Sequence, residues 1–210
     1  MGFDMFSERP PDAEQQAAVM KASNRIDDLE MHRRHATSET AAKAIDDQLD
    51  SAWNDYEKAR TGLYFRLNIW AMGAARHIMR EIGMIKDAPA PQWPTLAEFD
   101  LTHLPEDPRD HPEGPKRTKI EKQLTTQQLQ FLAAYWNTRE GDAGLPAIPA
   151  YKLMSNDGWL VTERETTAAL HAWESVTPEA QAQTLTDNPW WLEWLDFLEY
   201  NATRGGFRVH

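Results

Sequence analysis

The first sixty residues combine long charged stretches with sparse, regularly spaced apolar side chains. In residues 11–33 and again in residues 38–60, apolar residues recur every three or four positions: Val19, Ala22, Ile26 and Leu29, then Ala42, Ile45, Leu49, Trp53 and Tyr56. This spacing is typical of amphipathic helices, and Ser38 suits the N-cap of the second one. The short polar link between the two predicts an antiparallel helical hairpin. Because each seam is narrow, we expect this arm, residues 1–60, to dock on the rest of the chain or on a second copy of itself.

The next segment, from Thr61 to Ile85, contains the chain's central apolar stretch. Its start is dense in large apolar residues and is compatible with an extended conformation. From about Asn68 the pattern becomes helical, and Gly83 suits the position just after a helix C-terminus. We interpret this helix as the central buried one.

Residues 87–116 differ from the rest because they hold more than half of the 13 prolines. Proline disrupts both helix interiors and sheet ladders, so the pattern predicts a long irregular connection. Its apolar residues are spaced out, at Trp93, Leu96, Phe99 and Leu104. These four anchors favour a segment that wraps the surface over a free linker between two sub-domains.

A β-hairpin is predicted in "YKLMSNDGWLVT", residues 151–162. Two four-residue runs, Tyr151–Met154 and Trp159–Thr162, flank a Ser-Asn-Asp-Gly link that suits a tight reversal. Thr162 with Glu165 three residues later forms a capping-box sequence, which predicts the start of a helix.

The remaining apolar patterns are helical, at 118–139, from Thr162 to about Ser175, after Thr177 and from Asn188 to Gly205. The last of these carries four tryptophan or phenylalanine side chains, which we interpret as core. The fold class is therefore mainly α: residues 61–210 form a helical core domain with one small β-hairpin, wrapped by residues 87–116 and preceded by the helical-hairpin arm.

Charge and composition narrow the function classes. The net charge of −11 argues against direct binding to DNA, which requires a basic surface. There is no cysteine, so disulfides and thiolate metal sites are excluded. No apolar run reaches the length of about 18 residues that predicts a membrane span, and the acidic start has no secretory signal pattern. We expect a cytoplasmic protein.

Candidate catalytic and metal-binding residues are few and scattered. No catalytic or phosphate-binding motif occurs. Asp157, Glu165 and His171 are the best local candidates for acid–base chemistry, but Glu165 and His171 are six residues apart and fall on different faces of a helix. Two groups of potential metal ligands lack a recognisable ligand spacing: His32 and His35, and His103, Asp107, Asp110 and His111. We therefore predict no metal, no cofactor and no catalytic residue, and an enzyme is the less favoured class.

The link in "SNDGWLVTERE" allows two interpretations. As a structural corner, Ser-Asn-Asp-Gly reverses the chain and Thr162 begins a helix. As a binding site, Asn156, Asp157 and Trp159 project from a rigid turn and suit a polar ligand or peptide. The corner explains more residues, and the site remains an alternative.

Four segments carry a resemblance: "MGFDMFSERPP", "YFRLNIWAMG" (64–73), "SNDGWLVT" (155–162) and "GGFRVH" (205–210). Together they resemble a family of uncharacterised actinobacterial proteins, found in chromosomes and in phages or mobile elements. The resemblance implies a cytoplasmic accessory protein and provides no activity or catalytic residue. It also implies that the last three of these segments meet in space.

The preferred function is a non-enzymatic interaction or regulatory accessory protein that acts through protein contacts, with an unidentified protein partner. A homo-oligomer formed through the arm is one option for such contacts. The alternatives are a small-molecule binder or hydrolase with a site near Asn156, Asp157 and Trp159, and an acidic phage-type decoy of a nucleic-acid-binding defence protein.

Overall fold

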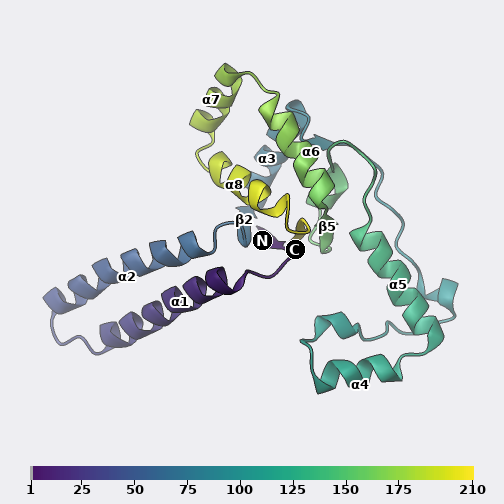
Figure 1. Cartoon of the computed structure of the whole chain (residues 1–210), viewed down its shortest axis with the longest axis horizontal. Coiled ribbons are helices and arrows are strands. Elements are labelled where there is room, and N and C mark those ends of the chain that lie inside the picture. Colours follow the sequence, from purple (N-terminus) through teal and green to yellow (C-terminus); the bar gives the residue numbers. More distant parts are fainter. Residues whose placement is uncertain (1) are drawn as a thin grey trace.

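The computed structural model describes residues 2–210, and helices dominate it (Figure 1). Residues 2–210 form eight α-helices: α1 (Ala13–Arg34), α2 (Glu39–Ala59), α3 (Ile69–Glu81), α4 (Pro115–Gln123), α5 (Thr126–Glu140), α6 (Glu163–Glu174), α7 (Pro178–Asp187) and α8 (Trp191–Asn201). Three short 3₁₀ helices, η1 (Leu96–Phe99), η2 (Pro108–Asp110) and η3 (Ala150–Leu153), lie between them. The mainly α prediction is confirmed at this level.

A four-stranded antiparallel sheet joins the two ends of the described chain. Its strands are β1 (Gly2–Ser7), β2 (Tyr64–Asn68), β5 (Trp159–Val161) and β6 (Phe207–Val209), in the order β2-β1-β6-β5. Each of the four segments that carry the family resemblance contributes one strand, so the predicted meeting of residues 64–73, 155–162 and 205–210 is confirmed. Two further strands, β3 (Ile85–Lys86) and β4 (Ile148–Pro149), pair in parallel.

The predicted β-hairpin at 151–162 is wrong. Residues 150–153 form η3, and only Trp159–Val161 is a strand, which pairs with β6. Tyr151–Met154 therefore does not pair with Trp159–Thr162, because the strand at 159–161 pairs with β6, almost fifty residues later in the chain. The sheet is consequently larger than the single hairpin that the local pattern predicts.

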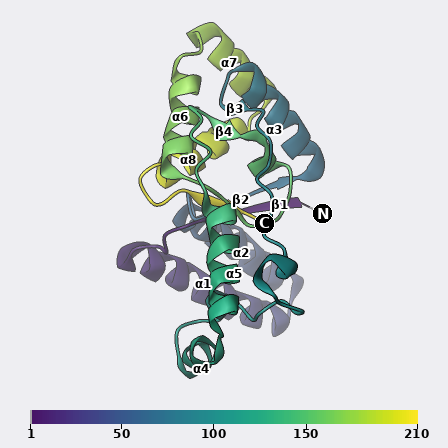
Figure 2. The ribbon, with the colours of Figure 1, turned by 90° about the vertical axis from the view of Figure 1, so that its right-hand side faces the viewer.

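Three parts extend from this sheet (Figures 1 and 2). The hairpin of α1 and α2 projects to one side, the α4–α5 lobe projects to another, and α3, α6, α7 and α8 cover the sheet above. Both N and C marks lie at the sheet, where the three parts meet (Figure 1). We refer to the sheet with α3, α6, α7 and α8 as the body.

The main core fills the space between one face of the sheet and the helices of the body. Phe65 of β2 packs against Trp194 and Phe197 of α8, with ring centroids 5.4 and 5.7 Å apart. Phe207 of β6 lies 5.1 Å from Phe197. The interpretation of the aromatic C-terminal helix as core is thus confirmed. This helix begins at Trp191, later than the start predicted at Asn188, and Asn188 is the C-cap of the preceding helix α7.

The arm has its own small apolar cluster and extends away from the body. Ile26, Leu29 and Ala52 are buried between α1 and α2, separately from the main core. At its base, Gln15 donates hydrogen bonds to the carbonyl oxygens of Ala59 and Thr61 at 3.2 and 3.3 Å. Beyond this base the α1–α2 hairpin projects away from the body and does not pack along it (Figure 1). The arm also begins later than the sequence pattern suggested, since the first residues form β1.

The proline-rich segment lies against α5, as the wrapping interpretation expected. Trp93 stacks on Tyr135 at a centroid distance of 4.8 Å, and Phe99 meets Phe131 edge-on at 5.6 Å. Leu104 does not act as an anchor, because it is 73% exposed. The single helix predicted at 118–139 is instead α4 and α5, since Thr125 caps a new helix with Gln128 in a capping box.

Candidate functional site

The corner that the sequence predicted around Gly158 is present. Gly158 has φ +75°, a conformation that residues with a Cβ rarely adopt, and its N–H donates to the carbonyl oxygen of Val209 at 2.9 Å. Thr162 accepts from the backbone N–H of Glu165, and the Glu165 carboxylate accepts from the N–H of Thr162 at 2.9 Å. The turn and the cap thus both have the predicted structural roles.

The three residues predicted as a binding surface do not share one. Asn156 donates its side-chain amide to the carbonyl oxygen of Gly2 at 2.9 Å, which ties the turn to β1. Trp159 is only 2% exposed, and its ring packs against Trp93 and Tyr151. Asn156 and Asp157 are both exposed, whereas Trp159 is not. A ligand at Asp157 would therefore not reach the covered face of Trp159, so the geometry does not bring these side chains together.

Lys152 is a residue that sequence reasoning missed. Its side chain is fully buried, and Nζ lies 2.9 and 2.8 Å from the two carboxylate oxygens of Glu165. Nζ also donates to the carbonyl oxygens of Gly141 and Leu160, both at 2.7 Å. Burial lowers the pKa of Lys152, and the adjacent Glu165 opposes that change. A lysine inside the apolar run "YKLM" was the only signal in the sequence.

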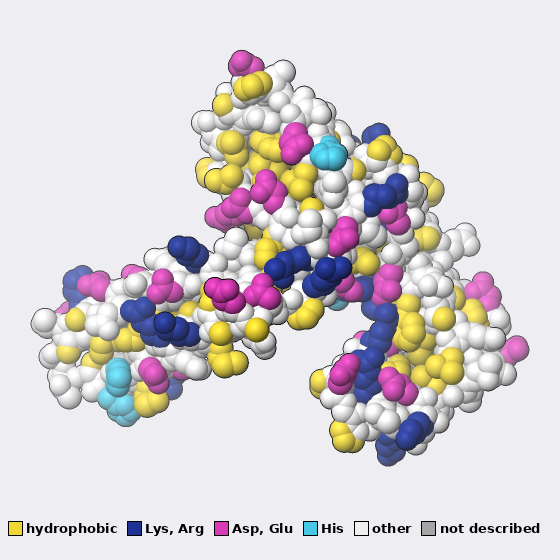
Figure 3. Space-filling view, in the orientation of Figure 1, with side chains coloured by type: hydrophobic (Ala, Val, Ile, Leu, Met, Phe, Trp, Pro, Cys, Tyr) yellow, Lys and Arg dark blue, Asp and Glu magenta, His cyan; other side chains and the backbone are white. Residues whose placement is uncertain are grey.

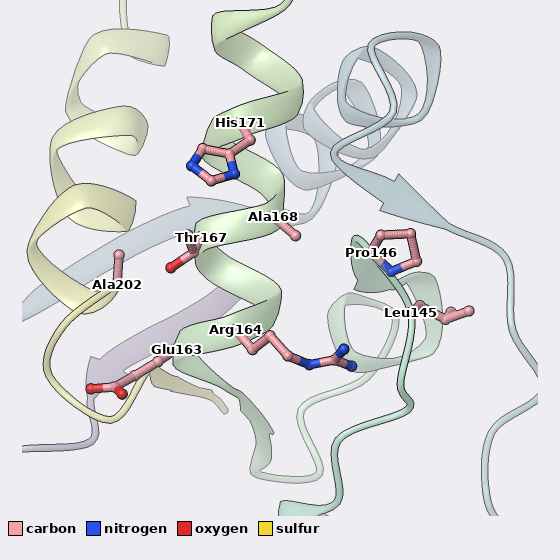
Figure 4. A pocket seen from close by; sticks show the side chains of 8 residues that line it. All are labelled: Leu145, Pro146, Glu163, Arg164, Thr167, Ala168, His171 and Ala202. Carbon is pink, nitrogen blue, oxygen red and sulfur yellow. The ribbon is translucent and has the colours of Figure 1, made fainter.

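A hollow of about 560 Å³ runs over the exposed side of α6 (Figure 4). In Figure 4 His171 and Thr167 point to the side of Ala202, whereas Arg164 points to the side of Leu145. Arg164 already binds Asp142, and Glu163 accepts a hydrogen bond from the Gly205 N–H at 2.6 Å. The polar groups of this hollow therefore do not converge on one reacting atom. Glu165 is buried and His171 is exposed, so the two lie on different faces of α6, as their spacing predicted.

The two edges of the sheet differ in their hydrogen bonding. At the β5 edge, the outward carbonyl of Leu160 is occupied by the buried ammonium of Lys152. At the β2 edge, the N–H of Ser7 donates to the carbonyl oxygen of Leu63 at 3.0 Å. This bond fixes which residues of β2 form backbone hydrogen bonds with β1. Backbone groups alternate along a strand, so Phe65 and Leu67 face β1, while Tyr64, Arg66 and Asn68 direct their N–H and C=O groups outward.

The outward groups of β2 are open to a partner. Apart from bonds between the strands, no backbone hydrogen bond within residues 2–210 reaches Tyr64 or Arg66. The Arg66 side chain is 58% exposed and lies 3.5 Å from Asp4 across the strands. An open edge of this kind is a template for another extended chain.

A second hollow, of about 400 Å³, lies beside the first residues of β2. It is bounded by the arm base, by Tyr64 and Phe65, and by the exposed side of α8. Its charged side chains are Glu57, Lys58, Arg60, Glu193 and Asp196. Arg60 lies near Glu57 at 3.8 Å and over the Tyr64 ring at 4.5 Å, whereas Glu193 and Asp196 make no ion pair within residues 2–210. The hollow thus offers two free carboxylates next to the open edge.

Comparison with protein-family models, with curated proteins and with solved structures finds no match. The resemblance to actinobacterial proteins therefore stays a prediction. No three His, Asp or Glu side chains within the described part of the chain lie close enough together to hold a metal ion. None of the helices of residues 2–210 combines the length and the apolar character needed to cross a membrane.

Proposed function

We propose that this protein is a non-enzymatic interaction protein that binds a partner polypeptide by pairing an extended segment of that partner with β2. The observation that carries the proposal is the open edge of β2, where the backbone groups of Tyr64 and Arg66 are directed outward. Addition of a strand provides backbone hydrogen bonds without new secondary structure in the protein, and side-chain pockets then provide specificity.

The charges around β2 favour a partner segment with a basic side chain. Glu193 and Asp196 line the adjacent hollow and lack ion pairs within residues 2–210, so a lysine or arginine of the partner would find carboxylates there. A second copy of this chain is a poorer partner for the edge. In a symmetric antiparallel pairing about the strand's middle residue, Arg66 would face Arg66, and like charges opposite one another destabilise strand pairing.

The other functions considered from the sequence have weaker support. A small-molecule site at Asn156, Asp157 and Trp159 lacks a shared surface. For an acidic decoy, the carboxylates of α2 would have to form a continuous face. However, Asp46 and Asp55 already bind Arg33 and Arg25 of α1, at 2.6 and 3.0 Å.

The experiment screens the full chain against a displayed library of random decapeptides and maps the selected peptides by amide chemical shifts. We expect the largest shifts and new hydrogen-exchange protection at residues 64–68. Arg66→Pro removes an outward N–H without removing a bond to β1, and proline is tolerated on edge strands. It should reduce binding at least tenfold. The matched control Arg66→Ala keeps the N–H and should bind within about threefold.

Two outcomes would contradict the proposal. One is a set of selected peptides whose shifts map away from β2. The other is equal binding by Arg66→Pro and wild type, with both shown to be folded by their amide spectra.

A further inference from the structure

Among residues 2–210, the side chain of Arg139, one residue before the end of α5, has no carboxylate partner. Its guanidinium lies 5.5 Å from the centroid of the Tyr135 ring, and its buried Nε has no acceptor. It makes no ion pair within residues 2–210. The nearest carboxylate in sequence, Glu140, is used by other arginines: Arg109 binds it at 2.8 Å and Arg208 at 3.0 Å. The terminal nitrogens of Arg139 are therefore free to bind an anion.

His210 lies beside this guanidinium, on the face of the sheet opposite the core. A Cβ placed on Gly158 would be 3.2 Å from His210 Cε1 and 3.6 Å from Arg139 Nη1, so the ring and the guanidinium both lie over Gly158. The centroid of the His210 ring also lies 5.8 Å from that of the Phe6 ring, and His210 is exposed. The cluster thus joins α5, the β5 turn and the end of β6 at an accessible surface. Dark-blue basic side chains follow the inner margin of the α4–α5 lobe up to the sheet (Figure 3).

The electrostatic surroundings of His210 are positive. Burial lowers the pKa of His210, and Arg208 and Arg139 lower it further, while Asp4 and Glu8 act in the opposite direction. Both of these acids already have partners. Asp4 accepts a hydrogen bond from the Tyr64 hydroxyl, and Glu8 lies 2.7 Å from Arg208. The uncompensated charge of the cluster is therefore that of Arg139.

We propose that Arg139 and His210 form a binding site for a phosphate group. Because Nε of Arg139 is buried, Nη1 and Nη2 face outward as a fork that matches two oxygens of a phosphate. A doubly charged phosphate also interacts with a protonated His210, whereas a singly charged carboxylate that pairs with Arg139 has little charge left for the imidazole. This site is separate from the β2 edge, and its success or failure leaves the polypeptide-binding proposal untouched.

The test follows the pH titration of His210 Cε1–H by NMR in the full chain, with chloride, inorganic phosphate or acetate at equal ionic strength. We expect saturating phosphate to raise the pKa of His210 by about one unit, a typical effect of an opposite charge at 4–6 Å. Acetate should raise it much less. The histidines of the arm, His32 and His35, are internal controls and should titrate alike in all three salts.

Variants connect the effect to Arg139. Arg139→Gln should abolish the phosphate-dependent shift, while Arg164→Gln on α6 should keep it. N-acetyl-O-phosphoserine amide provides a second probe: tighter binding than inorganic phosphate assigns the site to a phosphorylated polypeptide, and equal binding assigns it to free phosphate. An unchanged His210 titration in phosphate, an equal effect of acetate, or the same shift in a folded Arg139→Gln protein would each overturn the proposal.

Discussion

Lys152 and Glu165 form an ion pair from which water is fully excluded, with Nζ 2.8 Å from the nearer carboxylate oxygen. The pair connects three elements, since Lys152 belongs to η3, Glu165 lies in the first turn of α6, and Nζ also donates to the carbonyl oxygen of Leu160 in β5. Glu165 therefore has two roles: it closes the capping box with Thr162 and neutralises the lysine.

The first prediction concerns the removal of one partner. Lys152→Met leaves a carboxylate buried without its cation, and breaking a buried pair in this way costs about 3–5 kcal/mol of unfolding free energy. Urea unfolding should show this loss. The double variant Lys152→Met/Glu165→Gln should be more stable than Lys152→Met alone, because a neutral amide oxygen can still accept the Thr162 N–H. An unfolding free energy that falls further in the double variant would contradict the role assigned to the pair.

This pair also illustrates how far the sequence predicts the molecule. The local signal Thr-x-x-Glu correctly predicts where α6 begins, because a capping box depends on residues three positions apart. The same pattern cannot reveal that Glu165 meets Lys152, which depends on how η3 folds back. Likewise, the apolar run at 159–161 identifies a strand, but its partner β6 is remote in the sequence, so the prediction of a local hairpin is wrong.

The candidate site was even less predictable. The sequence predicts a site at Asn156, Asp157 and Trp159 because a turn displays its side chains, yet Trp159 is covered by Trp93 from the proline-rich segment. The open edge of β2 has no signature in the residues of β2 itself. It depends on which strands pair and in what order, and that order brings the first and last described strands together.

The second prediction separates backbone strain from steric overlap at two glycines. Gly83 and Gly206 have nearly equal φ values of +80° and +88°. A Cβ at Gly83 meets nothing within 4 Å, whereas one at Gly206 would lie 1.9 Å from the carbonyl oxygen of Val161. Gly83→Ala should therefore lower the unfolding free energy only through the strain of a left-handed backbone conformation, by about 1–2 kcal/mol. Gly206→Ala should cost clearly more in urea unfolding and should shift the amide signals of β5. Equal losses would show that β5 moves aside freely.

The third prediction concerns acid stability at Asp142. A hydrogen bond from Arg164 lowers the pKa of Asp142 from 3.8 to about 2, with help from the Gly144 N–H. A carboxyl group whose pKa is lower in the folded state stabilises the protein above the unfolded pKa and loses this effect as the pH falls. Because Arg164 is about half exposed, screening reduces the contribution to about 1 kcal/mol.

Unfolding free energies measured between about pH 5 and pH 2 test this expectation. In Asp142→Asn, the loss of unfolding free energy between about pH 5 and pH 2 should be smaller by about 1 kcal/mol than in the wild type. The exposed control Asp157→Asn should lose as much as the wild type. A pH profile of Asp142→Asn that parallels the wild type would show that the contact with Arg164 is not maintained in solution.

The last prediction concerns the independence of the arm. Its cluster of Ile26, Leu29 and Ala52 is separate from the main core, and Ile45 and Leu49 pack against it. Ile45→Asp/Leu49→Asp places two carboxylates in this seam, where burying unpaired charge is costly. The arm should lose its helical structure, seen as a lower helical circular dichroism signal and fast hydrogen exchange over residues 13–59.

The body should stay folded in the same variant, because its apolar contacts do not pass through the arm. Slow exchange in β5, β6 and α8 would then persist. Met20→Asp is the matched control, since Met20 is 57% exposed on α1 and should leave exchange in the arm unchanged. If exchange accelerated together in the arm and in α8, the two would form one cooperative unit. If the double variant kept wild-type exchange throughout, the seam between α1 and α2 would not be what holds the arm together.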